Sequence, residues 1–250
     1  MTRRLCFIAS VVLAVAVSTS WTQPQTPAVR ADSAARGATR PASVPPPSPV
    51  SFWGLDVLLS TDGFGIGAFY RHDFTPDVCG FTSFSISEAK DDREFEQYNI
   101  YGESYIPGKL NRFLVLPLMF GVQYRLFRED IVDSFRPFVN AAIGPAMVYM
   151  MPYADFTVNA DGTTSVQQVE YFHALGHGTP HYTGSLYVGF GANFGSDGSS
   201  LVGVNFRYYF TYFFGEGLPS MYDPNTLAPS VNKTDFGGFY ITFNVGTGVN

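Results

Sequence analysis

The sequence predicts an all-β fold, namely a closed antiparallel transmembrane β-barrel of eight strands, with ten as the alternative. Two patterns predict it: from Phe52 onward, apolar and polar residues alternate with a period of two, and long and short connections alternate between the predicted strands. The composition agrees, because only 14% of the residues are charged and 16% are aromatic, against about 25% charged in ordinary globular proteins. A protein that turns one face to lipid needs few charges.

Residues 1–20 are expected to form a cleavable signal peptide. Two arginines precede an almost wholly apolar stretch, Leu5 to Val17, and small residues follow it. That stretch is too short for a bilayer-spanning helix, which needs about 20 residues. Residues 21–50 are rich in Pro, Ala and Ser and are expected to be a disordered leader. The barrel domain is therefore assigned to residues 51–250.

Eight segments have the pattern of strands: 51–61, 63–74, 78–90, 111–127, 136–152, 183–195, 201–215 and 235–247. After the first hairpin, short connections (75–77, 128–135 and 196–200) alternate with long ones (91–110, 153–182 and 216–234). Barrels of the bacterial outer membrane place short turns on the periplasmic rim and longer loops outside. Residues 154–172 leave two alternatives open, an extra hairpin that makes ten strands or a β extension above the membrane.

The two faces of the predicted strands indicate which side meets lipid. On segment 201–215, Val204, Phe206 and Phe210 alternate with Asn205, Arg207 and Thr211. The polar face has too few Lys and Glu residues for a solvated exterior, so it is expected to line a narrow lumen. Aromatic residues near strand ends are expected to form interfacial girdles; they are Trp53, Tyr70, Phe74, Phe127, Phe135, Phe194 and Phe214.

Three segments resemble motifs of small outer-membrane barrels. Leu116–Leu126 looks like their "P-L…Y-R-F" strand, Arg136–Pro145 is similar to "R-P-Y-V…G-x-G", and Phe236–Phe243 resembles their C-terminal assembly signal. Over residues 51–250 the chain thus resembles the OmpA-, OmpX- and OmpW-like family. The resemblance implies residence in the outer membrane of a Gram-negative bacterium, contact with membrane lipid and lipopolysaccharide, and folding by the barrel-assembly machinery.

Charge distribution narrows the class of partners. The chain has a net charge of −6, but residues 1–50 carry five Arg and one Asp, so residues 51–250 carry −10. An acidic domain argues against nucleic acid, whose binding depends on Lys and Arg that neutralise phosphates. We expect a monomer without a cofactor.

Five charged residues are predicted to point into the lumen: Asp56, Arg71, Asp73, Arg125 and Arg207. Charges in a narrow barrel are costly unless they are paired. The favoured interpretation is a salt-bridge network that plugs an eight-stranded barrel, whose interior side chains nearly fill. The other interpretation is a selectivity ring for a small pore.

Three histidines, His173, His177 and His181, are spaced four apart in a long loop. Imidazoles in such a cluster are candidate ligands for zinc, copper or nickel. A helix would align them, but Gly176 and Pro180 oppose a regular helix, so a polar surface loop is the alternative.

The sequence favours a non-enzymatic outer-membrane barrel, with a structural or surface-interaction role or a narrow small-solute pore. The acidic segment Asp91–Glu96 suggests outward-facing contacts. A secreted lipocalin-like barrel that binds an apolar ligand is the first alternative. The second is a lipid-modifying barrel enzyme, which requires an outward-facing histidine beside a serine at the outer rim. No enzyme is expected, because the serines next to His72's strand face inward.

Overall fold

The computed structural model describes residues 51–249 except positions 99, 101, 103, 130, 132, 133, 162, 163, 195–199 and 224. The predicted signal peptide and leader lie outside the described residues, as does nearly all of the turn predicted at 196–200. Within the described part of the chain, no helix has the length and apolar character needed to cross a bilayer.

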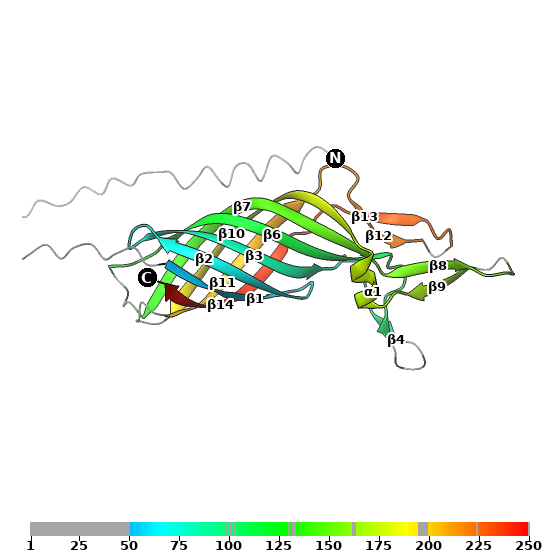
Figure 1. Cartoon of the computed structure of the whole chain (residues 1–250), viewed down its shortest axis with the longest axis horizontal. Helices are drawn as coiled ribbons and strands as arrows, with labels where there is room; N and C mark the ends of the chain where they lie inside the picture. Colours follow the sequence, from blue (N-terminus) through cyan, green and yellow to red (C-terminus); the bar gives the residue numbers. More distant parts are fainter. Residues whose placement is uncertain are drawn as a thin grey trace, which may run out of the picture. The chain divides into compact units, whose positions relative to one another are not determined.

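Eight strands form a closed antiparallel barrel, which confirms the predicted fold (Figure 1). Each strand pairs with its neighbour along the chain, and β14 pairs with β1 to close the cylinder, so no strand edge is left exposed. The barrel strands are β1 (Ser51–Ser60), β2 (Phe64–Asp73), β3 (Val78–Ala89), β6 (Asn111–Arg125), β7 (Phe135–Pro152), β10 (Thr179–Phe194), β11 (Ser200–Tyr212) and β14 (Gly238–Val249).

The long connections gather at one end of the barrel, which we call the loop end, and the other end is the terminal end, where β1 begins and β14 stops (Figure 1). The loop end carries three small two-stranded sheets and one short helix. They are β4 (Gln97–Tyr98) with β5 (Ser104–Tyr105), β8 (Ala154–Val158) with β9 (Thr164–Gln168), β12 (Leu218–Tyr222) with β13 (Pro229–Lys233), and α1 (Tyr171–Gly176). The segment predicted at 154–172 is therefore a β extension, and the barrel has eight strands.

The last barrel strand, β14, starts at a later residue than the sequence predicts, and the turn before it explains the difference. Asp235, the residue at which the strand is expected to begin, does pair with Tyr212 of β11, but the continuous strand starts only at Gly238. Before it, the Asp235 carboxylate accepts a hydrogen bond from the Gly237 amide (2.8 Å), and this turn sends Phe236 into the barrel mouth, where it is 1% exposed. The apolar side chain is thus used to fill the mouth instead of extending the strand.

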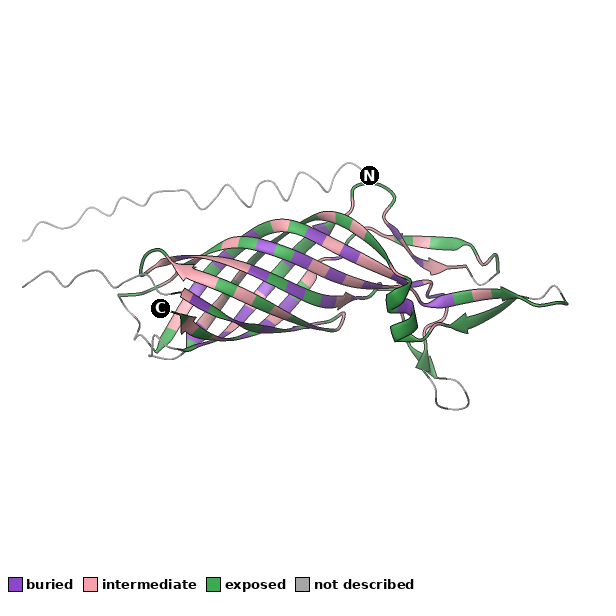
Figure 2. Ribbon diagram, in the orientation of Figure 1, coloured by how far each residue is buried: buried purple, intermediate pink, exposed green. Residues whose placement is uncertain are grey.

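The predicted division between the two faces is confirmed along the strands, and Figure 2 shows the alternation of buried and exposed residues. On β11, Asn205, Arg207 and Thr211 are buried inside the barrel. The outward-facing Phe210 and Phe243 are 43% and 42% exposed. A secreted lipocalin-like barrel would have its apolar face inside, so that alternative does not fit.

The aromatic residues predicted as girdles are all exposed, and most of them cluster at the terminal end. Trp53 pairs with Tyr70 across strands β1 and β2, and the rings of Phe135 and Phe194 lie 5.7 Å apart. Phe214 is at the loop end instead. Monomeric soluble proteins rarely expose so many large apolar side chains on one surface.

Glycines permit the barrel to close. Gly54 of β1 faces Gly246 of β14 on one side and Phe69 of β2 on the other. A Cβ atom at Gly54 would lie 2.2 Å from the Val245 carbonyl oxygen and 2.7 Å from the ring of Phe69. The absence of side chains at both glycines leaves room for the Phe69 ring at the seam.

Candidate functional site

A buried ion pair lies near the middle of the lumen. Arg207 Nη1 is 3.3 Å from Asp56 Oδ2, and the Asn244 amide donates a hydrogen bond to the other carboxylate oxygen. The Arg207 guanidinium also lies over the Tyr187 ring, 5.2 Å from its centroid. Since both side chains are less than 10% exposed, each charge depends on the other for compensation.

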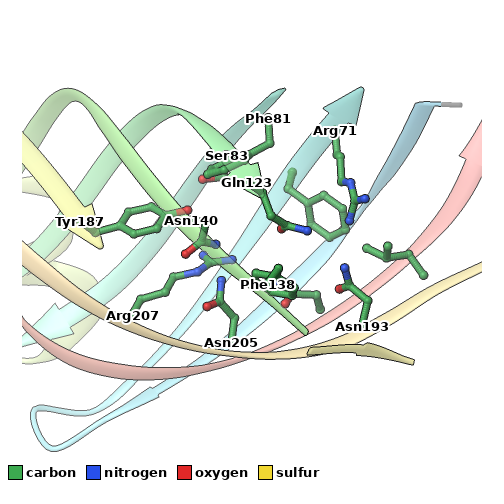
Figure 3. Close-up of a pocket in the computed structure, with 13 residues that line it drawn as sticks. Arg71, Phe81, Ser83, Gln123, Phe138, Asn140, Tyr187, Asn193, Asn205 and Arg207 are labelled. Carbon is green, nitrogen blue, oxygen red and sulfur yellow. The ribbon is translucent and has the colours of Figure 1, made fainter. Parts of the chain in front are cut away.

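A small polar cavity of about 30 Å³ adjoins this pair (Figure 3). Four of its lining residues, Asn140, Tyr187, Asn205 and Arg207, each have a buried polar atom without a hydrogen-bond partner. A space of this size is enough for an ordered water, which can satisfy two to four such atoms. The cavity suits water but is far too small for an organic ligand.

The other predicted lumen charges lie closer to the terminal end. Arg71 pairs with Asp73 at 2.8 Å, and its guanidinium lies 5.8 Å from the centroid of the Phe52 ring. Arg125 is the last residue of β6, where its backbone amide donates to the Asp77 carbonyl (2.8 Å). The five residues thus include two separate ion pairs, and the proposal that they form one network stays a prediction.

Two layers of mainly apolar side chains fill the lumen between the Asp56–Arg207 pair and the loop end. The central layer consists of Leu58, Met119, Ala142, Tyr187, Tyr209 and Tyr240, with Phe81 packed against it. The mouth plug consists of Ala89, Phe113, Val115, Val148, Leu218 and Phe236. Phe113 and Phe236 pack edge to face at 5.0 Å, an arrangement that aromatic pairs prefer.

Almost no empty volume remains between the central layer and the mouth plug. A cavity of about 10 Å³ remains there, at the lower limit for a single water molecule. Leu218 and Phe236 come from the connection between β11 and β14, so the loops themselves contribute to sealing the mouth. Both cavities described here, of about 30 and 10 Å³, are of the size of single water molecules.

A second polar cluster fixes the loops to each other. Asp91 is 4% exposed and accepts hydrogen bonds from Arg93 Nε (2.7 Å) and Ser220 Oγ (2.8 Å). Burial by itself would raise the pKa of Asp91, but the hydrogen bonds from Arg93 and Ser220 outweigh it and lower the pKa to about 2. The carboxylate therefore joins the segment after β3 to strand β12.

Lys109 and Glu94 form the other half of this cluster. Their side chains are 2.5 Å apart and each is only 3% exposed, while the Asp91 amide donates to Glu94 Oε1 (3.1 Å). The sequence predicts an outward-facing segment at Asp91–Glu96, but Asp91 and Glu94 face inward. Sequence reasoning missed this because the partner Ser220 is 129 residues away.

The loop end is acidic even after these internal pairs are considered. The segments 61–63, 90–110, 153–178 and 213–237 contain 12 acidic and four basic residues, a net charge of −8. Asp92 and Glu96 are exposed. Such a surface attracts cations and cationic groups over a distance of about 8–10 Å at ordinary salt concentrations.

The structure brings together two of the three candidate histidines. A short helix, α1, forms despite the glycines, because Glu170 caps its first turn by accepting a hydrogen bond from the His173 amide (2.9 Å). The rings of His173 and His177 have centroids 4.4 Å apart. His181 lies on β10, where its Nε2 is 3.3 Å from Thr179 Oγ1. Among the described residues, no group of three or more His, Cys, Asp or Glu side chains is placed to hold a metal ion.

One serine–histidine pair bears on the enzyme alternative. His72 Nδ1 is 2.8 Å from Ser51 Oγ, which also accepts a hydrogen bond from the Tyr70 hydroxyl (3.1 Å). These residues lie at the terminal end, opposite to the rim where a surface lipid-modifying site is expected. The nearby Asp73 is paired with Arg71, so it does not orient the imidazole as an acid in a catalytic triad does. The pair is a cross-strand contact.

No known protein family and no curated protein matches the chain. Among solved structures, the chain is similar to the N-terminal β-barrel domain of OprF from Pseudomonas aeruginosa (11% identity, 80% of this chain and 97% of that chain, TM-score 0.39). It is also similar to OprG from Pseudomonas aeruginosa (11%, 81% and 95%, TM-score 0.40). A third similar structure is Ail from Yersinia pestis in a nanodisc (13%, 80% and 99%, TM-score 0.38). The eight-stranded barrel is established by its own strand pairing.

Proposed function

We propose that this protein is a non-conducting barrel of the bacterial outer membrane that acts through its loop end as a surface-interaction element. The observation that carries the proposal is the mouth plug, in which loop residues Leu218 and Phe236 pack on barrel residues Phe113 and Val148. A pore needs an open water path, and here side chains of the loops and of the barrel wall together occupy the mouth.

The exterior supports residence in a membrane. Outward side chains such as Leu55, Phe190 and Val245 are about 60% exposed, and lipid is the environment in which such a belt is stable. Closure of the barrel pairs the backbone groups that hydrocarbon cannot satisfy. The partners proposed for the belt are membrane lipid and lipopolysaccharide, around a monomeric barrel folded by the barrel-assembly machinery.

The loop end supports a binding role, because the Asp91 and Lys109 cluster pre-orders the long connections. Pre-ordered loops lose less conformational entropy on binding a partner. The excess of acidic residues favours partners with cationic groups, or anionic surfaces bridged by divalent cations.

The test of the proposal is conductance in a planar lipid bilayer. The folded protein, identified by the shift in its gel mobility on heating, is expected to leave the bilayer current at its background value. The double variant Phe113→Ala with Phe236→Ala is the matched comparison, since it removes the two largest side chains of the mouth plug. Stepwise currents from the unaltered protein would contradict the proposal.

A further inference from the structure

We infer that His173 and His177 form a two-imidazole binding site for a borderline divalent metal ion, of the class of Zn²⁺, Ni²⁺ or Cu²⁺, at the loop end. The site does not depend on the non-conducting role proposed above. It differs from the three-histidine cluster that the sequence suggested, because the fold separates His181 from the other two.

Helix α1 provides the alignment. His173 lies within α1 and His177 is its C-cap residue, so the two lie about one helical turn apart, and pairs of histidines at this spacing are a recurrent zinc-binding arrangement. Ala174, between them, is fully buried, and the Leu175 carbonyl accepts a hydrogen bond from the Tyr149 hydroxyl (2.8 Å). The helix is therefore anchored to β7, and its histidines are presented by a fixed element.

The hydrogen bonding of His177 leaves a nitrogen lone pair for a metal ion. His177 Nδ1 lies 2.9 Å from the His173 carbonyl oxygen. Because a carbonyl only accepts, Nδ1 carries the hydrogen, and Nε2 of the neutral ring is unprotonated. A backbone carbonyl that holds one ring nitrogen while the other binds metal is the usual support for a histidine ligand.

The separation of the rings is close to what one ion requires. Two imidazoles on a tetrahedral ion, with bonds of about 2.0–2.1 Å, have ring centroids about 5 Å apart. The observed centroids are 4.4 Å apart with the ring planes inclined at 37°, so a shared ion requires the two side chains to rotate until their nitrogens converge. His181 pairs with Val148, a buried residue of the mouth plug, so its side chain lies on the opposite face of the barrel wall from Tyr149 and α1.

The surroundings favour a cation. His173 and His177 line a hollow of about 450 Å³ together with Asp155, Gln167 and Glu170. Asp155 and Gln167 pair across the β8–β9 hairpin, which places both on its histidine side. Because imidazole nitrogen is preferred by zinc, nickel and copper over magnesium and calcium, the site selects the borderline ions, with water as the further ligand.

Calorimetric titration of the full chain in detergent micelles with ZnCl₂ and with NiCl₂ tests the inference. A Cys6→Ser background removes the thiol of the predicted signal peptide as a competitor. The expected result is one ion per chain, with affinity lowered at least about tenfold by His173→Ala or by His177→Ala, since even a lost supporting contact costs that much. Asp155→Asn is expected to weaken binding by a smaller factor.

The controls are His181→Ala and His72→Ala, which together with the pair account for all four histidines of the chain. Both are expected to bind like the unaltered protein, and heat-dependent gel mobility shows that each variant is folded. The inference is overturned if the unaltered protein binds neither ion, or if His181→Ala weakens binding as much as His173→Ala does.

Discussion

At the scale of single residues, the protein buries charged side chains in the lumen, where the oppositely charged neighbour takes the place of water in stabilising each charge. Asp56 and Arg207 lie 151 residues apart in the sequence but are both buried in the lumen. Replacing Asp56 with Ala leaves the guanidinium of Arg207 unpaired, and breaking a buried pair in this way costs about 3–5 kcal/mol. We expect the denaturant midpoint of Asp56→Ala in micelles to fall accordingly.

Removing both charges together separates the cost of an unpaired charge from the loss of the ion pair itself. The combination of Asp56→Leu with Arg207→Met removes both charges, and it is expected to be more stable than Asp56→Ala. The exposed Asp155→Ala serves as the control and should change stability by less than about 0.5 kcal/mol. Equal stability of Asp56→Ala and Asp155→Ala would contradict the proposed dependence of Arg207 on Asp56.

Asp91 gives a pH-dependent prediction outside the barrel wall. Its pKa of about 2 lies below the ordinary value of 3.8, so the folded loops bind its proton more weakly than the unfolded chain does. Its contribution to loop stability is therefore complete above about pH 4 and is lost as the pH falls towards 2. The Arg93 amide, which donates to Asp91 (3.1 Å), is expected to report this titration in NMR spectra with a midpoint near pH 2.

Two variants check this assignment. Ser220→Ala removes one hydrogen bond to the carboxylate and should move the midpoint upward, whereas Asp91→Asn should abolish the titration. A titration midpoint near pH 3.8 for the Arg93 amide in the unaltered protein would show that Asp91 is not held by Arg93 and Ser220 in solution.

At the scale of elements, the closing seam between β1 and β14 depends on Gly54. Because its Cβ atom would lie 2.2 Å from the Val245 carbonyl oxygen, Gly54→Ala forces the backbones apart, at a cost of about 1–3 kcal/mol. Gly184 of β10 is the matched control, since an added Cβ there meets nothing within 4 Å. We expect Gly54→Ala to refold with lower yield on heat-modifiability gels and Gly184→Ala to refold normally. Equal yields would show that the seam tolerates a side chain.

The elements also show which features are predictable from the sequence. The residues that point into and out of the barrel can be predicted from a local period of two. This pattern alone correctly places Asn205 inside the barrel and Phe210 outside it. The alternation of connection lengths likewise identifies the loop end. The mouth plug is not predictable in this way, because a period of two gives the inward face of Phe236 but not its packing on Phe113, which belongs to a distant strand.

The histidine loop illustrates the same limit at closer range. Glycines near His173 and His177 argue against a helix, yet one short turn suffices to align two of the three rings. The cap from Glu170 and the anchor from Tyr149 stabilise it, and Tyr149 belongs to strand β7. Helix propensity takes the glycines into account but not the tertiary contact with Tyr149, which outweighs them.

At the scale of the whole molecule, the two ends of the barrel differ in a way that fixes an expected orientation. The terminal end has short turns and a girdle that includes Trp53 and Phe135, whereas the loop end carries extended hairpins and most of the acidic residues. Outer-membrane barrels place their short turns on the periplasmic rim and their long loops outside, so the loop end is expected to face the outside of the cell.

Single-cysteine labelling in a Cys6→Ser, Cys79→Ala background tests this orientation. Asp161→Cys lies at the tip of the β8–β9 hairpin, and Glu129→Cys lies in the turn between β6 and β7; both positions are exposed. A membrane-impermeant maleimide added to intact cells is expected to label Asp161→Cys at once and Glu129→Cys only after the cells are lysed. The reverse pattern would place the acidic loops in the periplasm. Labelling of both without lysis would contradict insertion in the membrane, because an intact barrel in a sealed bilayer exposes only one end to the reagent.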